Sequence, residues 1–190
     1  MKKMLALAIL FALAAGAANA APPPQPPLPK IVVIDRSAIM RFSKAGQDIA
    51  RQVQMLANQA KADLTAQGRS LQTEEAQLQQ QIAILAPDVK QRRIAEFEEK
   101  RNALQGLAQR KEAMIQGGVM QAQRQMEQVL APILQQIIQE RGANLVLDKQ
   151  AVVFASNSAF DITPDAINRL NGKLSSVKVS LVNPPPGAPK

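Results

Sequence analysis

The chain has 190 residues, a formal net charge of +8 and no Cys, His, Trp or Tyr. These absences exclude disulfides, thiol nucleophiles and mechanisms that need a histidine base, and they restrict any zinc site to carboxylate ligands. Apolar residues make up 46% of the chain, which argues against disorder, but much of that share is Ala and aromatic residues are only 3%. We therefore expect one domain with a small core.

Residues 1–20 have the pattern of a secretory signal peptide. Lys2 and Lys3 precede an uncharged apolar run at 4–15, and the small residues at 18–20 fit cleavage after Ala20. The run is shorter than the roughly 20 apolar residues of a membrane span, so an N-terminal anchor is the less favoured alternative. Because two Lys leave with the peptide, 21 basic and 15 acidic residues remain, a net charge of +6. We expect this mature chain to be exported to the periplasm.

Proline-rich tails are expected at both ends of the mature chain, at 21–29 and 176–190. Six of the 13 prolines lie in residues 22–29 and four more in 184–189, a density that neither helix nor sheet accepts. We expect extended tails that act as spacers or partner ligands, or that are disordered ends of the chain.

Three short runs rich in β-branched residues predict the strands of a small sheet, at 30–35, 143–148 and 151–154. Only Lys149 and Gln150 separate the second run from the third, so we expect these two to form a β-hairpin. Three short strands with few large side chains are marginal alone, and an oligomer that shares the sheet edges would stabilise them.

A last helix is predicted to begin near residue 163. Thr163 suits its N-cap, Pro164 suits its first helical position, and Asp165 complements the helix dipole. Asn171 followed by Gly172 is the expected end of this helix.

About a hundred residues between the first two strands have the composition of long helices, rich in Gln, Ala, Glu, Lys, Arg and Leu. Leucines recur every seven residues, but the register slips by one between Leu56 and Leu64, so we expect a supercoil that is weak or mixed in hand. Pro87 breaks the helix, Asp88 suits the N-cap of its continuation, and Gly142 suits the final C-terminal end. One tight turn at Pro87 predicts an antiparallel hairpin.

The predicted fold class is α+β, a small β-sheet body with an inserted long antiparallel α-helical, coiled-coil hairpin. We assign residues 30–48 and 130–175 to the body and residues 49–129 to the hairpin arm. Arms of about 42 residues would each be about 63 Å long. A compact chain of this size has a radius of gyration of only about 15 Å, so the arms must project. Large apolar residues become rare toward Pro87, which predicts a loosely packed tip.

Three residues interrupt the second helical stretch, namely Gly117, Gly118 and Pro132, and each is unfavourable inside a helix. We interpret the glycine pair as a flexion point and the proline as a kink near the body. The alternative is that they are tolerated local weaknesses.

The order of these features resembles the Skp/OmpH family of periplasmic chaperones. The resemblance rests on a signal peptide, on the runs at 30–35 and 143–148 that flank the helical hairpin, and on residues 151–154 and 161–165. It covers about residues 30–174. It implies a homotrimer whose small sheets associate into a body from which three hairpins project, enclosing a cavity that holds unfolded outer-membrane β-barrel proteins without ATP. The proline-rich tails, Pro132 and the glycine pair depart from the family pattern.

No catalytic, cofactor-binding or metal-binding motif stands in the sequence, so we expect no enzyme activity and no cofactor. Asp35 and Asp148 each end a predicted strand, which indicates a structural role at the sheet rim. Residues 88–101 carry five basic and four acidic side chains. This stretch is a candidate surface for acidic clients, an anionic membrane or lipopolysaccharide, and a solvated coiled-coil surface is the alternative.

Flexible Met side chains are candidates for lining a promiscuous binding surface, with soft core filler as the alternative. The candidate client-binding residues are Lys90, Arg92, Arg93, Lys100, Arg101, Met114 and Met120. The residues expected to form the body and its oligomer contacts are Ile31, Val33, Leu145, Leu147, Val152 and Phe154.

The leading functional hypothesis is an ATP-independent holdase that binds unfolded outer-membrane proteins, prevents their aggregation and delivers them for membrane assembly. A structural coiled-coil scaffold or adaptor in the envelope is one alternative, which the irregular helical period opposes. Nonspecific nucleic-acid binding is another, which the signal peptide and the mixed, aromatic-poor charge pattern oppose.

Overall fold

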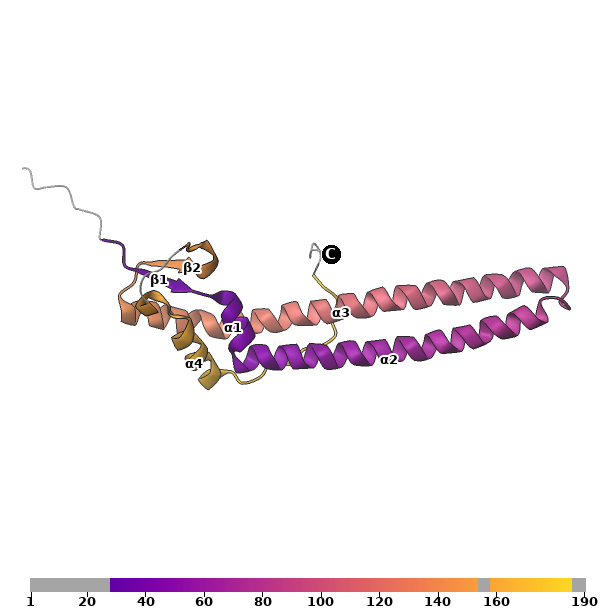
Figure 1. The fold of residues 1–190 in the computed structure, drawn as a ribbon, viewed down its shortest axis with the longest axis horizontal. Coiled ribbons are helices and arrows are strands. Elements are labelled where there is room, and N and C mark those ends of the chain that lie inside the picture. Colours follow the sequence, from indigo (N-terminus) through magenta and orange to yellow (C-terminus); the bar gives the residue numbers. More distant parts are fainter. Residues whose placement is uncertain (1–27, 154–157, 186–190) are drawn as a thin grey trace, which may run out of the picture.

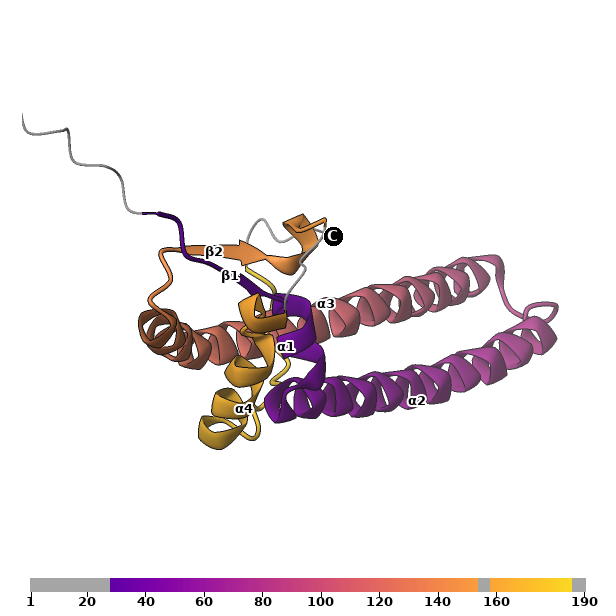
Figure 2. The same ribbon diagram turned by 60° about the vertical axis from the view of Figure 1, so that its left-hand side comes forward.

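The computed structural model describes residues 28–153 and 158–185, so the predicted signal peptide and most of the predicted N-terminal tail lie outside the described residues. Two long helices, α2 (Lys44–Gln81) and α3 (Pro87–Arg141), lie side by side and extend away from a small body (Figures 1 and 2). The body holds the strands β1 (Ile31–Ile34) and β2 (Leu145–Asp148) and the helices α1 (Arg36–Phe42) and α4 (Thr163–Lys173). The predicted class, a small sheet with an inserted antiparallel helical hairpin, is confirmed.

The sheet has two parallel strands, in which Ile31 stands opposite Leu145 and Ile34 opposite Asp148. In Figure 1, α3 continues past the start of α2 and turns back into β2, so β2 enters the sheet in the same direction as β1. An isolated parallel bridge joins Val33 to Asp161 on the other side of β1. Among the described residues, no strand pairs with the second edge of β2.

The predicted hairpin between a second and a third strand is wrong. Residues Lys149–Ala151 form a short 3₁₀ turn, η1, instead of a reverse turn. The Asp148 carboxylate accepts a hydrogen bond from the Gln150 amide at 2.9 Å, and the Val152 amide donates to the Lys149 carbonyl at 3.2 Å. These local bonds turn the chain away from β2, and Phe154, the last residue of the predicted strand, lies outside the described residues.

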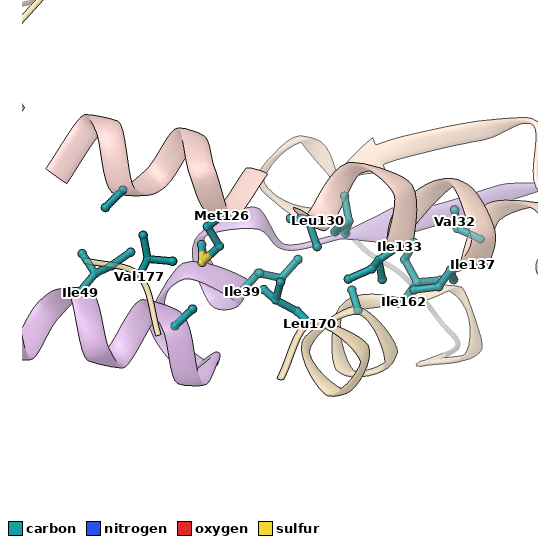
Figure 3. Close-up of a cluster of buried hydrophobic side chains, with 14 of the residues drawn as sticks. Val32, Ile39, Ile49, Met126, Leu130, Ile133, Ile137, Ile162, Leu170 and Val177 are labelled. Carbon is teal, nitrogen blue, oxygen red and sulfur yellow. The ribbon is translucent and has the colours of Figure 1, made fainter. Parts of the chain in front are cut away.

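A buried cluster at the base of the hairpin joins the elements of the body (Figure 3). It takes side chains from one face of β1, from α1, from the first turns of α2, from the last third of α3 and from α4. The largest fully buried side chains of this cluster are those of Ile39, Met126, Ile133, Ile137, Ile162 and Leu170. The core therefore sits where the two long helices meet the sheet, and the tip of the hairpin is remote from it.

Polar side chains cap the N-terminal ends of α1 and α2. The Asp35 carboxylate caps α1 by accepting from the Ala38 amide at 2.8 Å. The Ser43 hydroxyl accepts from the Gly46 amide at 3.1 Å and caps α2. Because both caps lie in the body, they set the direction in which α2 leaves it.

Two of the predicted helix starts are wrong in detail. Helix α3 begins at Pro87 with Ala86 as its N-cap, so Asp88 lies in the first turn and does not cap. The N-cap of α4 is Ile162, which makes no side-chain capping bond, so Thr163 is the first helical residue, and its hydroxyl accepts from the distant Asp35 amide at 2.8 Å. Helix α4 also continues through the predicted stop at Asn171 and ends at Lys173.

The predicted end of α3 is confirmed. Gly142 has a left-handed φ of 60°, and its amide bonds back to the carbonyls of Gln139 and Ile138. This conformation costs glycine little, which lets the chain reverse sharply into β2.

The hairpin itself has almost no buried core, as the sequence predicts for its tip. Over residues 50–116, Phe97 is the one buried residue. Ion pairs link the two helices instead, Lys111 to Asp63 at 2.7 Å and Lys100 to Glu74 at 2.5 Å. Both pairs are 11 residues apart on each helix, so the register is constant between them. Partly exposed pairs of this kind stabilise a fold by only about 1 kcal/mol or less each.

Residues 174–185, which we call the C-terminal segment, pack in an extended form against the base of the hairpin. This differs from the free tail expected from residue 176, because Val177 and Val179 are buried in the core cluster. Gly117 and Gly118 are buried beneath this segment inside the continuous helix α3. A methyl group on Gly117 would overlap the Val182 carbonyl, and one on Gly118 the Ser180 carbonyl.

The glycine pair is thus a seat for a closely approaching backbone, which corrects its interpretation as a flexion point. Helix α3 is also continuous through Pro132. Pro132 has no amide hydrogen to donate, so one helical hydrogen bond is missing there, on the exposed side of the helix.

We expect Gly118→Ala to destabilise the protein by about 1–3 kcal/mol, because the added methyl group meets backbone that cannot move without leaving the core. Denaturant unfolding at a fixed protein concentration measures this change. Gly106→Ala is the matched control, since it lies on the same helix with no atom within 4 Å of the added carbon. It should stabilise the protein by up to about 1 kcal/mol through helix propensity. Equal gains in both variants would contradict the role of Gly118 as a seat.

Candidate functional site

The predicted basic residues near the hairpin tip divide into paired and unpaired groups. Arg93 pairs with Glu96 at 3.7 Å and Arg101 with Glu98 at 3.0 Å, each on the same helix. Lys100 crosses to α2, as described above. Lys90 and Arg92 are exposed and have no ion pair among the described residues. These two side chains are therefore the cations of the set that remain available to a partner.

Exposed apolar side chains lie close to these two cations. The turn at 82–86 joins α2 to α3, and its Ile84 is 85% exposed. Ile94, one turn after the free cations, is 37% exposed. Sequence reasoning missed Ile84, although an apolar residue in a turn that has no core beside it is the signal that identifies it. The tip thus presents apolar and basic groups together.

A groove of about 760 Å³ runs between α2 and α3 on the body side of the tip. Its lining is mostly small or aliphatic, with Ala57, Leu64, Ala108 and Ile115, and Lys111 among its polar residues. Because alanines face each other here, the two helices do not fill the space between them. Two further grooves of about 470 and 600 Å³ follow toward the tip and have more polar linings.

The predicted Met residues lie apart from the cations. Met114 and Met120 are half-buried near the base of the hairpin, and the Met114 carbonyl accepts from the Val182 amide at 3.2 Å. From Lys90 to Met114 is 24 residues, about 36 Å along a helix. The predicted client-binding set therefore forms two separate patches.

The predicted sheet residues differ in exposure. Ile31 and Leu145, which stand opposite each other, are 37% and 43% exposed, and Val146 is exposed as well. Val33 is buried in the single chain. Leu147 and Val152 are half-buried. Val146 was not selected from the sequence, although it lies between two selected residues. Leu145 and Val146 thus form exposed apolar surface on β2, the strand with the unpaired edge, and Ile31 lies beside them on β1; we call these three residues the sheet rim.

Charged side chains hold the opposite end of the strands. The Lys149 ammonium binds the Asp161 carboxylate at 2.9 Å, and this contact raises the pKa of Lys149. Partial burial acts to raise the pKa of Asp161, but hydrogen bonds from Thr163 and Lys149 outweigh it, so the net shift is downward. Bonds from Ser37 and the Ala38 amide lower the pKa of Asp35. These contacts support the structural role predicted for Asp35, and Asp148 caps the 3₁₀ turn η1.

The junction between α3 and α4 carries a second ionic contact. The Arg169 guanidinium binds the Glu140 carboxylate at 3.0 and 2.6 Å and also binds Asp165 on its own helix at 2.8 Å. The hydrogen bonds from Arg169 lower the pKa of Glu140. This contact fixes α4 against the end of α3.

Within residues 28–153 and 158–185, no group of three acidic side chains is arranged to hold a metal ion. In the same part of the chain, no helix is both long and apolar enough to cross a membrane.

Residues 30–170 match the family model described as outer membrane protein (OmpH-like). The chain belongs to this OmpH-like family. A crystal structure from Caulobacter crescentus CB15, described as a candidate outer membrane chaperone (OmpH-like), is similar in fold, with a TM-score of 0.69 and 25% sequence identity. The similarity covers 83% of this chain and 92% of that chain. No curated protein sequence matches the chain.

The OmpH-like match begins one residue before β1 and ends within α4. It includes the whole hairpin and both strands. The C-terminal segment lies beyond the matched residues, so this contact with the hairpin belongs to a part of the chain that the OmpH-like family model does not include.

We expect acid to destabilise the protein through Asp35, Asp161 and Glu140. Their pKa values are lower in the folded chain, so their stabilisation is present above the unfolded carboxyl pKa of about 4. It is lost as the pH falls through the lower folded values. Because the chain has no His, the Tm should be nearly constant from about pH 6 to 9 and should fall below about pH 4. Thermal unfolding followed by circular dichroism measures it.

Asp161→Asn tests this assignment. The variant should have a lower Tm at neutral pH and a smaller further loss in acid than the unaltered chain. Glu75→Gln is the control, since Glu75 is exposed and has no ion pair or hydrogen bond among the described residues. An acid loss in Asp161→Asn as large as that of Glu75→Gln would contradict a contribution from Asp161.

Proposed function

We propose that the protein is an ATP-independent holdase, which binds unfolded outer-membrane proteins in the periplasm, prevents their aggregation and delivers them for membrane assembly. The observation that carries this proposal is the long OmpH-like hairpin with one buried residue between positions 50 and 116. A hairpin built in this way presents its surface to other molecules and buries little of it against itself. The apolar run at the N-terminus supports export through a cleavable signal peptide.

Many weak contacts along the hairpin would hold a client. The alanine-lined groove offers shallow apolar space, the tip offers Ile84, and Lys90 and Arg92 offer positive charge. An unfolded chain has no fixed shape, so several adaptable patches suit it better than one rigid pocket. Met114 and Met120 at the base extend the same kind of surface toward the body. The free cations also suit an anionic membrane surface or lipopolysaccharide.

The exposed sheet rim supports a homotrimer. Leu145 and Val146 are exposed on β2, whose second edge is unpaired among the described residues, and Ile31 is exposed beside them on β1. Such an edge in a small sheet is a liability unless another chain covers it. Association of three bodies at this rim would place three hairpins around one space. Simultaneous contacts with several hairpins would then strengthen weak client binding by avidity.

A structural scaffold or adaptor in the envelope remains the second hypothesis. It needs tightly packed helices and a fixed partner. The open grooves between α2 and α3 oppose it. Recovery of one stoichiometric partner from periplasm would favour the scaffold, whereas recovery of many β-barrel precursors would favour the chaperone.

The mature protein should suppress the light scattering of a porin diluted from urea at one trimer per client, without nucleotide. Lys90→Gln combined with Arg92→Gln should slow capture at low salt by a factor of about 2 to 5, because two unpaired cations near the contact are lost. At about 1 M salt, where the Debye length is about 3 Å, the difference should disappear.

Arg93→Gln combined with Arg101→Gln is the matched control, since it removes the same charge from cations already paired on the helix. Its effect on capture should be smaller. Unchanged scattering in the presence of the unaltered protein would refute the holdase, and equal effects of the two double variants would refute the role of Lys90 and Arg92.

Light scattering of the purified mature protein should give the mass of three chains. Leu145→Glu should produce monomers, because a carboxylate at the apolar rim would be desolvated by the neighbouring chain. Met55→Glu is the control, since Met55 is exposed on α2 away from the sheet. A monomeric unaltered protein would contradict the trimer, and a trimeric Leu145→Glu variant would contradict this interface.

A further inference from the structure

We propose that the C-terminal segment, residues 174–185, is a strap that ties α2 to α3 and sets how far the hairpin opens. The proposal concerns the shape of the hairpin and is independent of what the hairpin binds. It starts from the buried glycine pair and from a polar contact on the facing helix. Both contact the same extended stretch of backbone.

On α2, the Gln52 side-chain amide both donates a hydrogen bond to the strap backbone and accepts one from it. Its amide nitrogen donates to the Val177 carbonyl at 2.8 Å, and its amide oxygen accepts from the Val179 amide at 2.8 Å. This is the bonding that a neighbouring β-strand would provide, supplied here by one side chain. The Asp48 carboxylate accepts from the Gln52 amide nitrogen at 2.6 Å and orients it.

The contact with Gln52 also explains a buried charge. Asp48 is 7% exposed, and an unpaired carboxylate at such a site is unfavourable. Its oxygens accept from Gln52 and from Arg51, which also forms an ion pair with it. Because the same Gln52 amide nitrogen donates to Asp48 and to the Val177 carbonyl, this side chain links the buried carboxylate at the start of α2 to the C-terminal segment.

On α3, the strap lies directly on helix backbone. Val182 donates its amide hydrogen to the Met114 carbonyl at 3.2 Å, and the carbonyls of Ser180 and Val182 fill the space above the glycine pair. Residues 177–179 contact α2 and residues 180–182 contact α3, so the strap crosses from one helix to the other. Both Val177 and Val179 belong to the core cluster, which anchors the crossing. Figure 3 shows Val177 between Ile49 and Met126.

The position of the crossing defines its effect. The alanine-lined groove starts at Ala57 on α2, five residues tipward of Gln52, and on α3 its body-side end at Gln116 overlaps the strap's contacts with Met114 and Gly117. Between that point and the tip, Phe97 alone is buried. The strap is thus the last firm link between the helices before the loosely packed region, and it lies outside the residues shared with the OmpH-like family model.

The absence of Cys lets a pair of labels measure the opening. Gln72→Cys on α2 and Asn102→Cys on α3 place spin labels at exposed positions on the two helices, each two residues closer to the body than the ion pair between Glu74 and Lys100. Pulsed electron paramagnetic resonance on the mature chain, mixed with excess unlabelled protein, gives the distribution of distances within one hairpin. The unaltered chain should give one narrow distribution.

Two variants release the strap. A chain ending at Ser175 removes it, and Gln52→Ala removes its grip while keeping the buried valines. Both should shift the distribution to longer distances and broaden it, and a synthetic peptide of residues 176–190 added to the truncated chain should reverse the change. Gln54→Ala is the matched control, since Gln54 is exposed and its side-chain amide donates to Asn58 on the same helix and not to the strap.

Circular dichroism shows whether each variant keeps its helices. If the truncated chain does not fold, Gln52→Ala compared with Gln54→Ala decides alone. A distance distribution that broadens in Gln52→Ala but not in Gln54→Ala supports the strap. The same distribution in both variants overturns the proposal, as does a folded truncated chain whose distances equal those of the unaltered protein.

Discussion

The buried cluster at the base of the hairpin is the constraint on which the rest of the structure depends. Isolated polar helices have little stability of their own, and tertiary packing supplies most of what they have in a protein. Here that packing is confined to one end, where Ile39, Ile133, Ile137 and Leu170 are fully buried. Everything beyond residue 50 of α2 continues a helix that was started and oriented in the body. The sheet, the caps and the C-terminal segment all act by completing this anchor.

The consequence for binding is a surface that the protein does not use for itself. Alanines between the two helices leave grooves, and cross-helix ion pairs keep the helices in register without closing those grooves. Water screens such pairs, so they hold the arrangement loosely. Such an open, loosely held surface is compatible with the holdase proposed above.

Much of the architecture could be predicted because it depends on local sequence signals. Pro87 marks the start of α3, and Gly142 ends it with the φ that glycine adopts readily. The partner of β1 could not be predicted by adjacency, because the long hairpin returns the chain to the start of the sheet and makes the pairing parallel. Thr163 likewise has a capping pattern, but its hydroxyl binds the Asp35 amide, 128 residues away.

The candidate site shows the same division. Basic residues near the tip could be selected from composition, but the availability of Lys90 and Arg92, unlike Arg93 and Arg101, depends on which side chains already have a partner. Gly117 and Gly118 were visible as an anomaly in a helix. The need for glycine at these two positions could not be predicted, because the backbone that packs on them belongs to residues 180–184, which composition alone assigns to a tail.

Helix α3 is long enough to act as a lever about Gly118, where the C-terminal segment packs on it, and we call this point the fulcrum. From Gly118 to Pro87 the helix runs 31 residues, about 46 Å. A tilt of only about 5° at the fulcrum would move the tip by about 4 Å, taking that length as the lever arm. A small tilt at the base is therefore magnified into a displacement of several ångströms at the tip of the hairpin. Residues at the base can in this way set the separation of the two helices at the far end of the hairpin.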